Sequence, residues 1–98
     1  MTSAARKAIA VIRECIASDT YAISVHFRER MDQRGLFWPD IQAVIDEPHD
    51  VVSCGEDRFD RPKWVVSGRC ATDDDIEIIC AIEIDNSGTE FITLYWVD

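Results

Sequence analysis

The sequence predicts an α+β domain in which two or three N-terminal helices pack on one face of an antiparallel sheet of about four strands. One observation is a change in hydrophobic period, which is helical up to Pro48 and approaches two from His49 onwards. Another is size, because 98 residues form one domain with a single core. The hydrophobic content of 47% is ordinary for such a chain.

The first helix is expected over residues 3–17, with Ser3 as its N-cap. Apolar side chains recur there at intervals of three and four residues, at Ala5, Ala8, Ile9, Ile12, Cys15 and Ile16. Asp19 interrupts this pattern, and residues 21–23 are expected to form a short extended segment. The segment leads to a second helix that is capped by Ser24.

The second helix is expected to run from Ser24 to about Arg34, where Gly35 tolerates a left-handed helix end. Pro39 suits the start of a third helix, and Pro48 ends it. One stripe of this third helix is apolar and is formed by Ile41, Val44 and Ile45. Trp38 is expected to lie in the core or at its rim, because aromatic side chains dominate core burial.

Period-two segments predict the strands, at residues 51–54, 63–70, 76–84 and 90–97. In the last strand we expect Ile92, Leu94 and Trp96 on one face and Phe91, Thr93, Tyr95 and Val97 on the other. The sequence Asp85-Asn-Ser-Gly88 is typical of a hairpin turn. Strands that follow one another so closely favour an antiparallel meander.

The second helix carries three basic side chains, His26, Arg30 and Arg34, at intervals of four residues. This spacing stacks them on one stripe of the helix, and Phe27 and Met31 form a neighbouring apolar stripe that can face a core. One imidazole and two guanidinium groups on one face suit an anion such as a phosphodiester. The alternative is a solvated charged face with local acidic partners.

The run around this stripe, His26-Phe-Arg-Glu-Arg30-Met31-Asp-Gln-Arg34-Gly35-Leu36, followed by Asp40-Ile41, resembles the opening signature of domain of unknown function 4258. The resemblance to this bacterial family extends more weakly to Phe91-Ile-Thr93-Leu-Tyr95 and covers about residues 20–96, so that residues 1–19 form an additional N-terminal helix of the single domain. The chain departs from the pattern at Phe27, where a small residue is usual. The resemblance implies the small fold of RelE-like toxins, which are metal-independent ribonucleases.

Such chemistry requires a base for the 2′-hydroxyl, an acid for the leaving oxygen and cations for the phosphoryl transition state. Histidine is the residue type best suited to acid or base work near neutral pH, so His26 is the candidate for this role. Arg30 and Arg34 supply fixed positive charge, and Tyr95 donates a proton or orients the substrate if the last strand faces the second helix. Each of these residues also has a purely structural interpretation. His26 could be bonded to the backbone at the helix start, and Tyr95 could be a core residue with a satisfied hydroxyl group. The two arginines could pair with the acidic strands and hold the helix to the sheet. Arg69 is a weaker candidate.

The net charge of −9 argues against a general nucleic-acid binder. Residues 1–35 carry six Lys/Arg against four Asp/Glu, a net of +2. Residues 36–62 carry two against seven, and residues 63–98 carry two against eight. An RNA contact is therefore expected to be local to the basic third. A second hypothesis is a non-catalytic module, such as an immunity or antitoxin-type partner whose acidic surface meets a basic nuclease. A third is a toxin fold that has lost its activity.

No metal or other cofactor is expected. The four cysteines, Cys15, Cys54, Cys70 and Cys80, have no C-x-x-C spacing, so we predict a reduced protein without a metal site. No run is long enough for a membrane span, and no signal peptide is recognisable at the N-terminus, which makes the cytoplasm the default expectation. The partners predicted from sequence are an RNA substrate and a cognate antitoxin or other protein.

Overall fold

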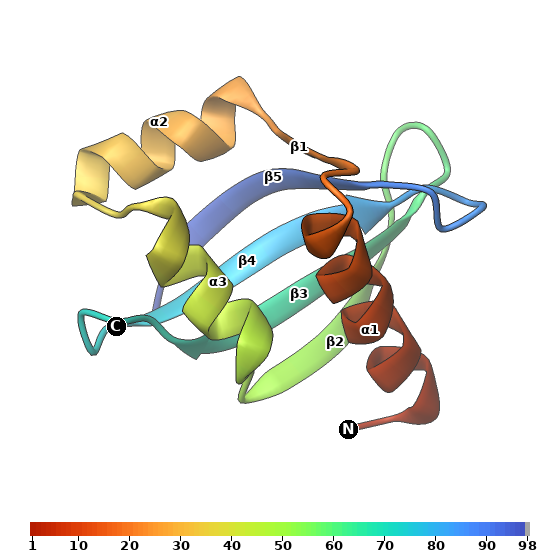
Figure 1. Cartoon of the computed structure of the whole chain (residues 1–98), viewed down its shortest axis with the longest axis horizontal. Coiled ribbons are helices and arrows are strands. Elements are labelled where there is room, and N and C mark those ends of the chain that lie inside the picture. Colours follow the sequence, from red (N-terminus) through yellow and green to blue (C-terminus); the bar gives the residue numbers. More distant parts are fainter. Residues whose placement is uncertain (98) are drawn as a thin grey trace.

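The computed structural model describes residues 1–97, which form three helices and a five-stranded mixed sheet. The elements follow one another as α1 (Ser3–Ala17), β1 (Tyr21–Ile23), α2 (Val25–Arg34), α3 (Trp38–Asp46), β2 (Asp50–Glu56), β3 (Pro62–Arg69), β4 (Asp75–Ile82) and β5 (Thr89–Trp96). The strand order is β1-β5-β4-β3-β2 (Figure 1). The predicted α+β class is confirmed, with one strand more than expected.

The additional strand is β1, at the segment that was expected to be short and extended. It pairs in parallel with β5, from Tyr21 opposite Thr89 to Ile23 opposite Phe91, whereas the other strand pairs are antiparallel. Because β1 leads directly into α2, the pairing holds the start of this helix beside β5 (Figure 1). The strand is therefore the element that positions the basic helix.

Helices α1 and α3 cover one face of the sheet, whereas α2 lies along β5 (Figure 1). The N-cap of α1 is Thr2 and not Ser3, because the Thr2 hydroxyl accepts a hydrogen bond from the backbone N–H of Ala5 at 3.0 Å. Arg13 of α1 donates hydrogen bonds to the backbone oxygens of Ile45 and Asp46 at 3.1 and 2.9 Å. These bonds satisfy carbonyl groups at the end of α3 and join the two helices.

The core lies between this helical layer and the sheet. Phe27 and Met31 of α2 are buried in it, as their spacing predicted. Trp38 packs against the core from the start of α3, with its ring stacked on Tyr21 at 5.1 Å and edge-on to Phe91 at 5.3 Å between ring centroids. Aromatic contacts thus join β1, α3 and β5 at one place in the core.

The expected alternation along β5 is wrong at its centre, because the strand contains a register shift. Ile79 of β4 pairs with Thr93, and the next residue, Cys80, pairs with Phe91, so Ile92 is an extra residue. Both Phe91 and Leu94 are consequently buried in the core. The shift also brings the neighbouring residues Ile92 and Thr93 to the opposite face of the sheet, where both border the groove described below.

Gly68 of β3 provides a specific test of the packing between α3 and the sheet. A Cβ atom at this position would lie 3.1 Å from Cγ1 of the fully buried Val44 and 3.5 Å from Cα of Pro48. Gly68→Ala is therefore expected to lower the free energy of unfolding by about 1 kcal/mol. Urea unfolding followed by tryptophan fluorescence measures this change. Ser67→Ala, one residue earlier on β3, is the control, and equal stability of the two variants would contradict the packing argument.

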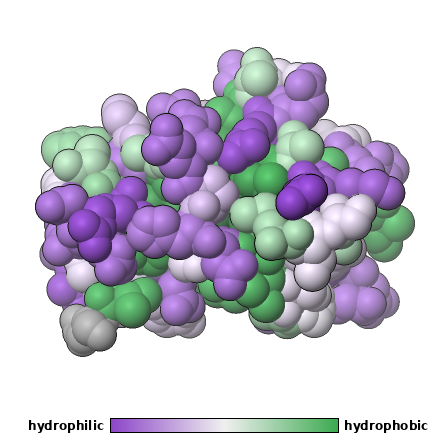
Figure 2. Space-filling model, turned by 90° about the horizontal axis from the view of Figure 1, so that it is seen from below, coloured by the Kyte–Doolittle hydropathy of each residue, from purple (hydrophilic) through white to green (hydrophobic). Residues whose placement is uncertain are grey.

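Hydrophilic residues cover most of the face in Figure 2, and the hydrophobic patches between them are small and separate. No helix within residues 1–97 combines the length and apolar character that a membrane crossing requires. The four cysteines are free thiols, and three of them, Cys15, Cys70 and Cys80, are buried. Burial raises the pKa of the Cys80 thiol to about 12, so this side chain is a neutral core residue.

Candidate active site

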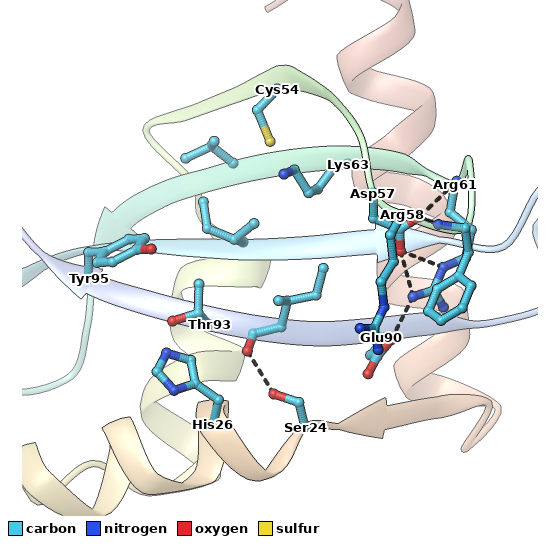
Figure 3. A pocket seen from close by; sticks show the side chains of 14 residues that line it. Ser24, His26, Cys54, Asp57, Arg58, Arg61, Lys63, Glu90, Thr93 and Tyr95 are labelled. Atoms are coloured by element: carbon cyan, nitrogen blue, oxygen red, sulfur yellow. Dashed lines mark hydrogen bonds and ion pairs between the residues drawn. The ribbon is translucent and has the colours of Figure 1, made fainter.

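The sheet face that α1 and α3 leave free contains a groove of about 700 Å³. Its floor is apolar and is formed by Val65, Ile79 and Ile92 from three neighbouring strands. The start of α2 borders it on one side and the loop between β2 and β3 closes one end, whereas Tyr95 lies at the other end (Figure 3). A concave surface with an apolar floor and polar side chains at its border is the usual form of a ligand site.

Two hydrogen bonds fix the start of α2 at the border of this groove. The Ser24 hydroxyl caps the helix by accepting from the N–H of Phe27 at 3.0 Å and donates to the carbonyl oxygen of Ile92 at 2.7 Å. The Ser24 N–H donates to the carbonyl oxygen of Phe91 at 3.0 Å. His26, two residues further along, is exposed and borders the groove.

The structure places two of the four candidate residues, His26 and Tyr95, in the groove. Arg30 lies next to it: its Nε donates to the carbonyl oxygen of Leu94 at 3.2 Å, and its guanidinium group is 5.3 Å from the centre of the Tyr95 ring. Arg30 therefore joins α2 to β5 and packs on the Tyr95 ring from outside the groove.

Arg34 is further from the groove, because its guanidinium group lies 4.8 Å from the ring centre of Trp96. Arg30 and Arg34 border a separate small pocket beside Leu94, so the basic side chains do not share one cleft with His26. The physical reason is that both arginines lie over aromatic rings of β5, which draws their side chains along the strand. Neither arginine forms an ion pair with the acidic strands within residues 1–97.

Cations reach the groove instead from β3 and from the loop before it, at positions that are not among the predicted site residues. Lys63 projects from β3 over the floor, and Arg58 projects from the loop between β2 and β3 (Figure 3). The residues around the groove include three Lys/Arg, with Arg61 as the third, and two carboxylates, so the local charge is opposite in sign to the net charge of −9. Lys63 precedes Trp64 and Val66, which face the core from β3, and this alternation is the sequence signal that could have identified the lysine.

Arg61 holds the loop between β2 and β3 at the end of the groove. Its guanidinium group is 2.6 Å from Asp57 of the same loop, 2.7 Å from Glu83 after β4 and 2.6 Å from Glu90 of β5 (Figure 3). Hydrogen bonds to Glu90, Asp57 and Glu83 raise the pKa of Arg61 further above its ordinary value. The two carboxylates of the groove, Asp57 and Glu90, thus share one arginine, which remains charged, with Glu83.

Asp57 accepts more hydrogen bonds than Glu83 or Glu90. Burial acts to raise its pKa, but hydrogen bonds from the Arg61 side chain and from the N–H groups of Arg61 and Phe59 outweigh this and hold the pKa below its ordinary value. The Cys54 thiol also borders the groove. Burial raises its pKa and the nearby Lys63 offsets only part of the effect, so Cys54 is not an activated nucleophile.

The groove thus combines an imidazole, a phenol and two cations that are free of carboxylate partners within residues 1–97, namely Lys63 and Arg58. These groups can transfer protons and stabilise negative charge on a phosphate. No group of three His, Cys, Asp or Glu side chains in the described part of the chain has a geometry that would hold a metal ion.

The family model for domains of unknown function DUF4258 matches residues 23–96, from the end of β1 to the end of β5. The match therefore includes His26, Lys63 and Tyr95 of the groove and leaves α1 outside. No curated protein and no solved structure matches the chain significantly. On the match to residues 23–96, the chain belongs to the family of domains of unknown function DUF4258.

Proposed function

We propose that this chain is a RelE-like toxin-related domain that cleaves RNA in the groove by acid–base chemistry without a metal ion. The observation that supports this most strongly is the convergence of His26, Lys63, Arg58 and Tyr95 on one open groove. They come from α2, β3, the loop before β3 and β5, and this arrangement provides both proton transfer and positive charge at one place.

In the proposed reaction His26 removes the proton from a ribose 2′-hydroxyl. The resulting oxygen forms a bond to the adjacent phosphorus, and the bond from phosphorus to the 5′-oxygen of the next nucleotide breaks. A proton donated to this 5′-oxygen completes the step, with Tyr95 as the donor or as the group that orients the substrate. The products are a 2′,3′-cyclic phosphate and a free 5′-hydroxyl, so atoms and charge balance without a redox partner or metal.

Lys63 and Arg58 act on the phosphate in this scheme, because they lie over the groove and carry no carboxylate partner within residues 1–97. Arg30 and Arg34 of α2, which were expected to supply this positive charge, have other roles in the scheme. Arg30 keeps the Tyr95 ring in place from outside the groove, and Arg34 packs on Trp96. Any RNA cleavage is therefore expected to depend on His26 first, on Arg30 through the tyrosine, and least on Arg34.

Substitution of Lys63 tests whether RNA binds in the groove. Lys63→Gln is expected to weaken binding of a short 2′-O-methyl RNA, which cannot be cleaved, and to reduce the salt dependence of binding by about 0.7 per lost phosphate contact. Fluorescence anisotropy over a range of salt concentrations measures both quantities. The chain offers a matched control in Lys7→Gln, which removes the same charge from an exposed position on α1, on the covered side of the sheet. Equal effects of the two substitutions would contradict binding in the groove.

A second candidate function is binding to a basic protein without catalysis. It is favoured by the charge of the C-terminal part, because residues 70–98 contain eight Asp/Glu and no Lys/Arg. Asp73 and Asp74 are exposed in the turn before β4. In this case neutralisation of the acidic segment at residues 73–77, and not of the groove, should weaken the complex.

A further inference from the structure

The hydroxyl group of Thr93 is a buried polar group without a partner. Thr93 is only 7% exposed, and its Oγ1 forms no hydrogen bond within residues 1–97. The residue nevertheless borders the groove, because its partner on β4 is the floor residue Ile79. Buried hydroxyl groups in native proteins are nearly always hydrogen-bonded, so this exception needs an explanation.

His26 of α2 borders the same groove as Thr93 and lies beside it (Figure 3). Two contacts align this helix with β5: Ser24 donates to the carbonyl oxygen of Ile92 at 2.7 Å, and Arg30 donates to that of Leu94 at 3.2 Å. His26 follows the first contact on the helix, and Thr93 lies between the two contacted residues on the strand. Figure 3 shows the imidazole ring directed from the start of α2 toward Thr93.

We propose that Thr93 is a positioning residue for His26, whose hydroxyl oxygen accepts a hydrogen bond from one N–H group of the imidazole. In a neutral imidazole one nitrogen donates and the other accepts. A hydrogen bond to Thr93 fixes the proton on the nitrogen that faces β5 and leaves the other nitrogen unprotonated toward the groove. A general base requires this arrangement, since its free lone pair must face the proton that it removes.

The proposal rests on the function proposed above, in which His26 is the base, but its geometric part can be tested without RNA. Nitrogen-15 chemical shifts of histidine rings report which nitrogen carries the proton. The chain contains two histidines, so His49 serves as an internal reference. In wild-type protein at a pH where the ring is neutral, we expect one tautomer of His26 to dominate and His49 to show the mixture of a solvated ring.

The variant Thr93→Val removes the hydroxyl and keeps the shape and the β-branching of the side chain. It is expected to convert His26 to a mixture of tautomers, and Thr93→Ser is expected to restore the single tautomer. Thr89→Val is the matched control, because Thr89 also has a buried hydroxyl without a partner but borders a different pocket. His26 signals that are the same in Thr93→Val as in wild type would overturn the proposal.

Measurement of RNA cleavage by the same variants distinguishes a failure of the positioning role of Thr93 from a failure of the proposed ribonuclease function. If the wild type cleaves RNA, Thr93→Val is expected to lower kcat about tenfold at unchanged KM, whereas Thr89→Val leaves both unchanged. Cleavage in wild type together with an unaltered His26 tautomer in Thr93→Val would overturn the positioning role alone. A tautomer that depends on Thr93 in a protein that cleaves no RNA would support the contact and contradict the ribonuclease.

Discussion

Replacement of His26 by alanine is expected to slow RNA cleavage by about a hundred- to a thousand-fold, because it removes the proposed general base. The side chain is exposed at the start of α2, so its loss should leave the stability of the fold nearly unchanged. Steady-state cleavage of RNA in the presence of a chelator gives kcat and KM, and circular dichroism checks folding.

His49→Ala is the matched control for this prediction. It removes another exposed imidazole, from the segment between α3 and β2, which does not border the groove. Arg30→Ala and Arg34→Ala complete the set, with the larger loss expected for Arg30 because it supports Tyr95. The same cleavage rate in His26→Ala and His49→Ala would exclude His26 as the base and would point to a contaminating nuclease.

Replacement of Arg61 by methionine is expected to lower the free energy of unfolding by about 2 kcal/mol at neutral pH. The arginine and Asp57 are only 11% and 10% exposed, so the substitution leaves a poorly solvated carboxylate without its cation. The effect should fall below the roughly 3–5 kcal/mol of a fully buried pair, because Glu83 and Glu90 are 45% and 34% exposed. Urea unfolding measures it, with the neighbouring Arg58→Met as the control.

The pH dependence of this difference follows from Asp57, whose pKa in the folded protein is lowered. The pKa of an aspartate in an unfolded chain is about 3.9. A carboxyl group whose pKa is lower in the folded state stabilises the fold at pH values above this, and the contribution is lost as the pH falls through the folded-state pKa. The difference between wild type and Arg61→Met should therefore be constant at neutral pH and shrink below about pH 4. A difference that grows on acidification would show that Asp57 is not held by Arg61.

The sequence could predict the features that depend on residues close to one another along the chain. Ser24 caps α2 and Gly35 ends it in the left-handed region at φ 65°, as their positions indicated. Phe27 and Met31 are buried as the helical period required. Such features arise from backbone sterics and side-chain periodicity, which operate within a few residues.

The rest of the site depends on contacts between distant segments. The register shift at Ile92 comes from the pairing of β4 with β5, and it brings Ile92 to the groove face beside Thr93. Arg58 reaches the groove because the ion pairs of Arg61 hold the loop, and this arrangement joins residues far apart in sequence. The four-residue spacing of His26 and the arginines suggested one shared anion-binding face, but the guanidinium groups of Arg30 and Arg34 lie over aromatic rings of β5 instead.

The measurement that tests the proposed ribonuclease most directly is the incubation of wild-type protein with single-stranded RNA in a chelator, with the ends of the products identified by mass spectrometry. Proton transfer by His26 in the groove predicts fragments with 2′,3′-cyclic phosphate and 5′-hydroxyl ends, and their formation should be lost in His26→Ala. RNA that remains intact, or that is cut only after addition of a divalent metal, would contradict the proposal. Tight binding of the same protein to a basic partner through residues 73–77 would then identify a non-catalytic binding module.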